Sequence, residues 1–196
     1  MDGKMKGMIM AGMAGLCLIL GIMGALGTTW LVDSEADEDA PESGYSLTAI
    51  HVDAEEAAQC DAMAGFLGGE CDGADYSYAF SDACEETEDD DACDMATGGM
   101  IGTIGMWAGI ICALMVTLSL VLPMAGVDAM DAVPEMGNKI ATWGAGALML
   151  VGMLGWYMML PDGGESSLGM SGWMAGAAMS MGLGSALIGQ FIEADE

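Results

Sequence analysis

Long uncharged apolar runs alternate along this chain with strongly acidic stretches. Four segments carry no charged side chain: Gly7 to Val32, Met95 to Val127, Ile140 to Pro161, and Ser166 to Ile192. A helix needs about 20 apolar residues to cross a hydrocarbon core roughly 30 Å thick. Backbone groups in lipid must bond within helices or closed barrels, and long runs without polar alternation favour helices. The pattern therefore predicts four membrane-spanning helices.

The flanking residues indicate where each helix begins and ends. We predict spans over residues 8–31, 99–122, 140–160 and 168–191, with Pro123 ending the second because proline removes a helical backbone bond. The predicted fold is an all-α membrane protein, a four-transmembrane-helix bundle with a small, disulfide-bonded, acidic α+β extracytoplasmic domain. The expected order is residues 1–32 (N-terminus and first helix), 33–98 (acidic extracytoplasmic domain), 99–122 (second helix), 123–139 (cytoplasmic loop), 140–160 (third helix), 161–167 (short outer loop) and 168–196 (fourth helix and cytoplasmic tail).

The lysines predict the orientation. Lys4 and Lys6 precede the first helix, and Lys139 precedes the third. With four crossings these positions lie on one side of the membrane, and positive charge near helix ends marks the cytoplasmic side. We therefore expect a multi-pass plasma-membrane protein with both termini in the cytoplasm.

The first apolar run has a second interpretation as a cleaved secretory signal. Lys4 and Lys6 would form its basic end, and Ala25-Leu26-Gly27 would offer small residues for cleavage. A signal's apolar region spans about 7–15 residues, whereas this run continues to Val32. The length favours a retained helix.

Charge excludes several classes of protein. The chain has 196 residues, 54% of them hydrophobic, yet 30 acidic side chains face only three lysines and no arginine, a formal net charge of −27. Twenty-one of these acids lie between Asp33 and Asp94. This segregation excludes a soluble monomer and a disordered acidic tail, and the lack of positive charge excludes a nucleic-acid binder.

The predicted helices are glycine-rich and methionine-rich, with 31 Gly and 22 Met in the chain. Small residues let helices pack closely in lipid, and they recur four apart at Gly7-Ala11-Gly15, Gly105-Gly109, Gly172-Gly176 and Ala178-Gly182-Ala186. We expect methionine to serve as a flexible packing residue, although clustered thioethers are also the soft ligands that suit Cu(I). Among the aromatic residues, Trp30, Trp143, Trp156 and Tyr157 are expected at the membrane interface, and Trp107 and Trp173 in the packed interior.

The predicted spans carry no Asp, Glu, Lys, Arg or His. Proton relays and substrate sites place such residues inside the bilayer, so a pump or proton-coupled transporter is not expected. His51 is the single histidine and lies in the outer segment, which excludes a bis-histidine haem within one chain. Thiol exchange is the one enzymatic chemistry to consider, and the absence of a Cys-x-x-Cys pair argues against it. We expect no catalytic residues and no bound cofactor.

The outer segment predicts a small folded domain. Residues 45–52 and 75–81 have strand character, and Asp53 with Glu56 matches a capping box before a helix that Gly68-Gly69 would end. Cys60, Cys71, Cys84 and Cys93 predict two disulfides, with Cys60–Cys71 and Cys84–Cys93 the favoured pairing of three. A zinc site is the alternative, and Cys17 and Cys112 are expected to pack within the membrane.

A dense acidic cluster near the end of this segment is a weak candidate for a cation site. Hard cations such as Ca²⁺ take several oxygen ligands, and the candidate residues are Glu85, Glu86, Glu88, Asp89, Asp90 and Asp91. The nearest approach to an EF-hand loop, Asp72-Gly73-Ala74-Asp75, has the wrong spacing. A solvated acidic face is the simpler interpretation, and a specific Ca²⁺ site stays an open alternative.

Trp30 at the end of the first helix, and Cys60 with Cys71 in a large first outer loop, carry a family resemblance. With four helices and both ends inside, the chain resembles the claudin and peripheral-myelin-protein type of tetraspan protein. The family's Trp…Gly-Leu-Trp…Cys…Cys signature is present here without its central Gly-Leu-Trp. The resemblance implies a left-handed four-helix bundle under a small disulfide-bonded sheet, and an adhesive or accessory role.

The sequence therefore predicts a non-enzymatic structural or accessory subunit of a membrane complex. Its expected partners are membrane lipid and either other membrane subunits or further copies of itself. The alternative is a cation channel or cation-handling protein with an acidic outer vestibule above an oligomeric pore.

Overall fold

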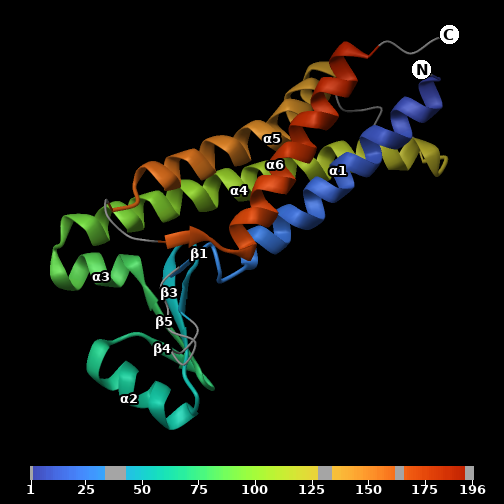
Figure 1. The fold of residues 1–196 in the computed structure, drawn as a ribbon. Helices are drawn as coiled ribbons and strands as arrows, with labels where there is room; N and C mark the ends of the chain where they lie inside the picture. Colours follow the sequence, from blue (N-terminus) through green and yellow to red (C-terminus); the bar gives the residue numbers. More distant parts are fainter. Residues whose placement is uncertain (1, 34–42, 128–133, 162–165, 193–196) are drawn as a thin grey trace. The chain divides into compact units, whose positions relative to one another are not determined.

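The computed structural model describes residues 2–33, 43–127, 134–161 and 166–192. Within these residues the protein is mostly helical, with six helices and six short strands (Figure 1). The chain forms two compact units. Unit 1 comprises Met1–Ala25, Ile104–Met153 and Met174–Glu196, and unit 2 comprises Leu26–Thr103 and Leu154–Trp173.

Four of the helices are long: α1 (Gly3–Leu26), α4 (Asp90–Met124), α5 (Glu135–Met158) and α6 (Met170–Phe191). Among the described residues, three helical segments are long and apolar enough to cross a membrane: Gly3–Leu26, Asp90–Met124 and Met136–Met158. Helix α6 has 22 residues and no charge, but it is not among these three candidate spans. The structure therefore indicates a helical membrane protein with three candidate spans.

Several predicted helix boundaries differ from the structure, since α1 begins at Gly3 rather than residue 8 and α5 at Glu135 rather than residue 140. Helix α1 ends at Leu26 rather than near residue 31, because the backbone of Thr29 and Trp30 bonds to other segments: Ser171 N–H donates to Thr29 O at 3.0 Å, and Trp30 N–H donates to Tyr45 O at 2.7 Å. Helix α4 begins at Asp90 and has 35 residues, which corresponds to about 52 Å. That length exceeds a hydrocarbon core of roughly 30 Å, so part of α4 must extend outside it.

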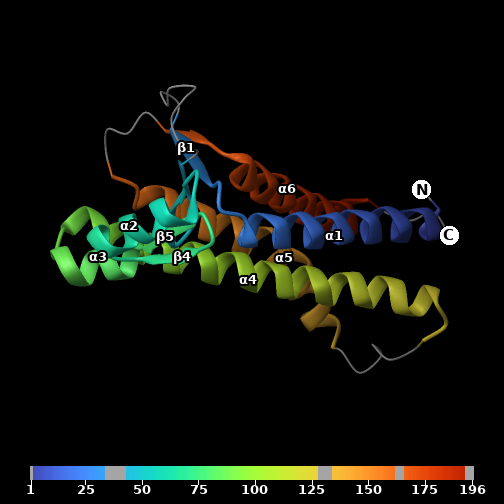
Figure 2. The same cartoon turned by 90° about the horizontal axis from the view of Figure 1, so that it is seen from below.

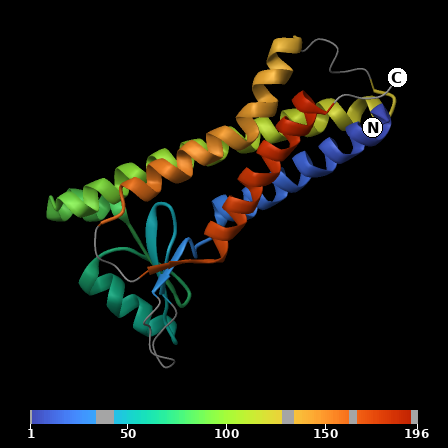
Figure 3. The same ribbon diagram turned by 45° about the horizontal axis from the view of Figure 1, so that its top comes forward.

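In unit 1, α4 and α5 lie side by side (Figure 3), and glycines allow their close packing. A Cβ atom added at Gly105 of α4 would lie 2.5 Å from the Cα of Gly152 in α5. One added at Gly182 of α6 would lie 2.9 Å from the Cα of Gly146, also in α5. Two pairs of glycines therefore bring the backbones of α4 and α6 against that of α5.

Helix α1 packs into the same unit through its own glycines. A Cβ added at Gly21 would lie 2.9 Å from the Cε of Met149, and one added at Gly24 would lie 3.0 Å from the backbone nitrogen of Ala175. Met149 is almost fully buried, as are Cys17 and Met106. The centre of unit 1 is thus filled by small residues and by methionine side chains.

Unit 2 contains an antiparallel sheet. Its strands are β1 (Leu31–Asp33), β2 (Ser43–Tyr45), β3 (Ala49–Asp53), β4 (Glu70–Asp72), β5 (Asp75–Ala79) and β6 (Ser166–Leu168), and their order is β4-β5-β3-β2-β1-β6. Strand β6, which the sequence did not predict, pairs Leu168 with Leu31 of β1. The sheet therefore draws on both ends of the chain, beyond the predicted domain at 33–98. The predicted outer loop residues Asp162 to Glu165 lie outside the described residues.

The predicted strand at 45–52 is in fact a hairpin. Ser46, between β2 and β3, accepts hydrogen bonds on its Oγ from the backbone N–H of Thr48 (3.3 Å) and Ala49 (3.0 Å). The predicted strand at 75–81 ends at Ala79, where α3 (Phe80–Thr87) begins. In both places a local turn or helix start interrupts a run that has strand character.

Helix α2 (Ala57–Leu67) packs against β4 and β5 (Figures 1 and 2). The predicted capping box is wrong: Glu56 is the N-cap and makes no side-chain hydrogen bond, while Asp53 ends β3 opposite Asp75. The core under α2 is built from Ala54, Cys60 and Tyr76.

The tryptophans differ in how far they are buried. Trp30 and Trp156, expected at the membrane interface, are buried and form an edge-to-face pair with ring centroids 5.1 Å apart. Trp107 and Trp173, expected inside, are 41% and 68% exposed. Trp30 is held in place because its backbone bonds to two segments: Gly169 N–H donates to Trp30 O at 2.8 Å, and Trp30 N–H donates to Tyr45.

Candidate functional site

The predicted acidic cluster lies where one helix ends and the next begins. Glu85 and Glu86 are in the last turn of α3, Glu88 is its C-cap in the left-handed conformation with φ of 52°, and Asp90 and Asp91 form the first turn of α4. Acids favour a helix N-terminus and oppose a C-terminus. The cluster therefore stabilises the start of α4 and destabilises the end of α3.

The structure does not gather these acids around a metal. Among the described residues, no group of three or more His, Cys, Asp or Glu side chains is placed to hold a metal ion. The carboxylate of Glu86 instead accepts a hydrogen bond from the Tyr78 hydroxyl at 3.0 Å. The six candidate residues, Glu85, Glu86, Glu88, Asp89, Asp90 and Asp91, are spread over a helix end, a left-handed residue and a helix start.

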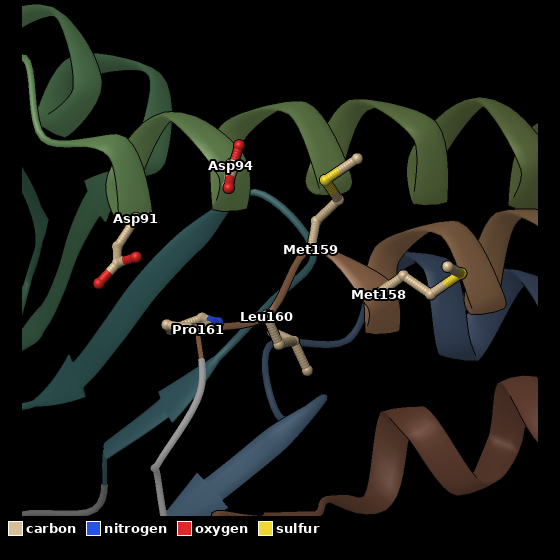
Figure 4. Close-up of a pocket in the computed structure, with 6 residues that line it drawn as sticks. All are labelled: Asp91, Asp94, Met158, Met159, Leu160 and Pro161. Atoms are coloured by element: carbon tan, nitrogen blue, oxygen red, sulfur yellow. The ribbon is translucent and has the colours of Figure 1, made fainter.

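One pocket in unit 2 does bring two acids to a common surface (Figure 4). Its volume is about 230 Å³, and its lining consists of Asp91, Asp94, Met158, Met159, Leu160 and Pro161. Asp91 and Asp94 are three residues apart in α4, a spacing that places them on one helix face. Two carboxylates attract a cation, but Ca²⁺ takes six to eight oxygen ligands, so this pair alone makes an acidic opening rather than a calcium cage.

Both predicted disulfides, with the favoured pairing, are present. Cys60 of α2 bonds Cys71 of β4, with Cα atoms 6.0 Å apart, and Cys84 of α3 bonds Cys93 of α4, with Cα atoms 4.7 Å apart. Cys60 is buried in the small core of unit 2. A core of this size gains from such covalent links, each worth about 2–4 kcal/mol.

A row of three carboxylates crosses one end of the sheet, and the sequence did not predict it. Asp75 of β5 lies directly opposite Asp53 of β3 on one side and Asp72 of β4 on the other. Like charges directly opposite one another destabilise a sheet. Strand register alone brings these residues together, so no local motif signals the row.

His51 lies in the middle of β3, opposite Gly44 of β2 and Ser77 of β5. It is half-buried, and this burial lowers its pKa below 6.5, while the negative charge of Asp75 acts in the opposite direction. The neutral imidazole is therefore the form that the folded sheet favours.

Hydroxyl groups in the helices of unit 1 bond to backbone carbonyls. Thr117, Thr142 and Ser180 each donate to the carbonyl four residues earlier in their own helix, at 2.7–2.9 Å. Ser185 donates to the carbonyl of Met10 in α1 at 3.4 Å. These hydroxyls therefore support the backbone and do not combine into a polar path.

The predicted small-residue repeats differ in how they are used. Gly105-Gly109 packs against α5, as described above for Gly105, and the repeat centred on Gly182 lies in the contact between α6 and α5. In the repeat on α1, a Cβ added at Gly7 or at Gly15 would meet nothing within 4 Å. We call Gly7, Ala11 and Gly15 the α1 seam.

Large apolar residues border the α1 seam. Met8 and Leu16 are each 48% exposed, and Ala11 is only partly buried. The seam is thus a shallow strip of small residues beside longer side chains, with the geometry of a surface that accepts a neighbouring helix.

Comparison with known proteins finds no family model and no curated protein that matches this chain. The resemblance to claudin and peripheral-myelin-protein tetraspan proteins therefore stays a prediction.

Proposed function

We propose that the protein is a non-enzymatic integral membrane protein that serves as a structural or accessory subunit of a membrane complex. The observation that carries the proposal is the open α1 seam. Many glycines of unit 1 pack against helices of the same chain, whereas Gly7 and Gly15, like Gly12 and Gly176, have no neighbour within 4 Å of an added Cβ. In lipid, helix association depends on such small-residue surfaces, so we infer that another membrane helix occupies the seam.

The interior of unit 1 supports a structural role. Met106, Ala113, Met149 and Ala178 are almost fully buried, and the hydroxyls bond to carbonyls. A transport path would need ionisable or water-facing polar groups among the helices. Within the described residues, the packing of unit 1 supports a scaffold.

We further propose a multi-pass topology with four spans, in which α6 is the fourth. Its 22 residues correspond to about 33 Å, close to the hydrocarbon thickness of a bilayer. The Nζ of Lys6 donates to the carbonyls of Gly189 (3.0 Å) and Ile192 (2.6 Å), and Lys139 lines a pocket with Gly189. Lys6 and Lys139 thus both lie near the C-terminal end of α6. Positive residues near helix ends mark the cytoplasmic side, so this supports both termini lying on the cytoplasmic side of the plasma membrane.

The packing of α1 supports its retention in the mature protein. Gly21 and Gly24 contact Met149, Ile110 and Ala175 of three other helices. Cleavage after residue 27 would remove these contacts from unit 1. We therefore propose a retained first helix and not a removed signal.

The experiment that tests the accessory role is the native mass and composition of the complex after extraction in mild detergent. A second protein present in constant stoichiometry supports the accessory role and identifies the partner. A complex containing only copies of this chain supports a homo-oligomer. A monomer without partners in native membranes overturns the proposal.

A second candidate function is a cation channel with an acidic outer vestibule, favoured by the pocket at Asp91 and Asp94. Because unit 1 is packed with buried side chains, the pore of such a channel would lie between copies of the chain. The test is cation flux into liposomes for the D91N/D94N variant, with E55Q/D61N as the control, because it also removes two negative charges but from residues that do not line the pocket. Wild-type flux that survives D91N/D94N unchanged contradicts the vestibule.

A further inference from the structure

The most exposed large apolar side chain among the described residues is that of Phe66, at the end of α2. Phe66 is 89% exposed, and its neighbour Leu67 is 51% exposed. Both residues belong to the acidic segment between the first two predicted spans, so a position inside a membrane-crossing helix does not account for their exposure. Exposed aromatic rings of this kind are the anchors that most often carry the binding energy of a protein interface.

The outward side of α2 next to Phe66 is apolar as well. Cys60 is the buried residue of this helix, and at about 100° per residue Ala58, Ala62 and Gly65 point to the opposite side. All three are exposed, and a Cβ added at Gly65 would meet nothing within 4 Å. The outward side of a surface helix normally carries polar and charged residues. We call Ala58, Ala62, Gly65 and Phe66 the α2 face.

The backbone that carries Phe66 is fixed by contacts within unit 2. The Tyr76 hydroxyl donates to the carbonyl of Gly68, directly beyond the helix, at 3.0 Å. The disulfide between Cys60 and Cys71 joins the middle of α2 to β4. A side chain on a fixed backbone loses less conformational freedom when it binds. Phe66 is therefore pre-organised as an anchor and is not the tip of a loose loop.

The charge around the α2 face decides which occupant fits. Fifteen acidic side chains lie between Asp53 and Asp94, a stretch with no Lys or Arg. Asp61 is exposed beside the face, and Glu55 and Glu56 are exposed where α2 begins. A second copy of the chain would bring like charges together, which disfavours binding, and an anionic lipid surface would repel the same acids. The occupant with complementary charge is a different protein with Lys or Arg around an apolar pocket.

We propose that the α2 face binds the basic surface of a different protein on the outer side of the membrane. The Phe66 ring enters an apolar pocket of that partner, and Lys or Arg side chains around the pocket face Asp61 and Glu55. The inference rests on the proposed role as an accessory subunit and adds the surface and the chemistry of the partner. It is independent of the α1 seam, which would meet a membrane helix.

The test uses photo-cross-linking of the full-length chain in native membranes. The variant Phe66→p-benzoylphenylalanine keeps an aromatic ring at the anchor position and bonds to whatever covers it. The expected adduct joins position 66 to a protein other than this chain, at a segment of that protein that carries Lys or Arg. The control is Asp89→p-benzoylphenylalanine, at an exposed residue between α3 and α4, which should not give this adduct.

A charge exchange at Gln59 tests the basic character of the partner. Gln59 is exposed at the edge of the α2 face, and Gln59→Glu and Gln59→Lys give side chains of similar length with opposite charge. Combined with the cross-linker at position 66, Gln59→Glu should give about five times the adduct of Gln59→Lys, the ratio expected for a change of charge at a solvent-exposed ion pair.

Several outcomes overturn the proposal. An adduct with lipid shows a membrane contact, an adduct with a second copy shows a homo-oligomer, and the absence of any adduct shows an open surface. Equal yields from Gln59→Glu and Gln59→Lys exclude a basic partner. Ala62→p-benzoylphenylalanine, on the same face, repeats the test if the variant at Phe66 does not fold. A native complex that contains a second protein but gives no adduct refutes the α2 face alone, whereas a chain without partners refutes the accessory role as well.

Discussion

Replacing Gly105 with alanine tests the packing of unit 1 most sharply. The added Cβ would lie 2.5 Å from the Cα of Gly152 and 2.8 Å from the carbonyl oxygen of Leu148. Favourable carbon–carbon contacts are about 3.5–4.0 Å long, so α4 and α5 must separate by roughly 1–1.5 Å at this point.

The magnitude follows from two opposing effects. Overpacking of a well-packed interior costs about 1–3 kcal/mol, whereas alanine gains about 0.8–1.0 kcal/mol over glycine in helix propensity. Gly105→Ala should therefore lower the free energy of unfolding by up to about 2 kcal/mol. The matched control is Gly12→Ala in α1, where the added Cβ would meet nothing within 4 Å. This control should keep the propensity gain.

The assay is reversible unfolding in mixed micelles followed by circular dichroism. The expected result is a gap of about 1–3 kcal/mol between Gly12→Ala and Gly105→Ala, with the latter less stable. Equal stability of the two variants, or a more stable Gly105→Ala, would refute the close contact between α4 and α5.

Three further predictions concern unit 2. Cys71→Ser breaks the bond to Cys60 and should lower the free energy of unfolding by about 2–4 kcal/mol; denaturant titrations that coincide with wild type would contradict this. Burial lowers the pKa of His51 in the folded protein. The stability that neutral His51 contributes is therefore present above about pH 6.5, its ordinary pKa, and is lost as the pH falls through the lower pKa of the folded state. His51→Gln should therefore lose less stability than wild type between pH 7 and pH 5, and parallel pH profiles would count against it. Asp75→Asn relieves the row of like charges and should stabilise the sheet by about 0.2–1 kcal/mol at neutral pH. Asp61→Asn on α2 changes the net charge by the same amount and should stabilise the protein less. Equal stabilisation by the two variants would show that net charge, and not the row of carboxylates, is responsible.

The long helices could be predicted from the sequence because uncharged runs of this length have one stable form in lipid. Their ends could not, because contacts from distant segments decide them. Helix α1 stops at Leu26 since Trp30 bonds to Tyr45 and Gly169. The sequence around residue 26 does not indicate these hydrogen bonds to Tyr45 and Gly169.

The sheet was only partly predictable for the same reason. The alternation Tyr76, Tyr78, Phe80 correctly placed β5 as far as Ala79. Strand β6 pairs with β1 across more than 130 residues of sequence, and a three-residue strand of this kind carries no periodic signal. The sequence predicted two disulfides but did not decide among the three pairings; the favoured pairing is the observed one, and its bonds close short loops with separations of 11 and 9 residues.

The candidate surfaces, too, could be predicted only in part from the sequence. The spacing of the α1 seam is visible in the sequence, yet only the packed structure shows that Gly7 and Gly15 lie open while Gly105 does not. The outward direction of the α2 face depends on the burial of Cys60, which the sequence of this helix does not show because it is apolar on almost every side.

The proposed role of the α1 seam can be tested by the native mass of a variant in which larger side chains fill the seam. In mild detergent, the variant G7L/G15L should lose the proposed partner chains, because leucine side chains would occupy the strip on which we propose that a neighbouring helix packs. It should keep its monomer stability, since both positions are open. Gly12→Leu, at an open position of the same helix outside the seam, should keep the complex intact. A G7L/G15L variant that runs at the same mass and composition as wild type would show that the α1 seam does not join the protein to a complex.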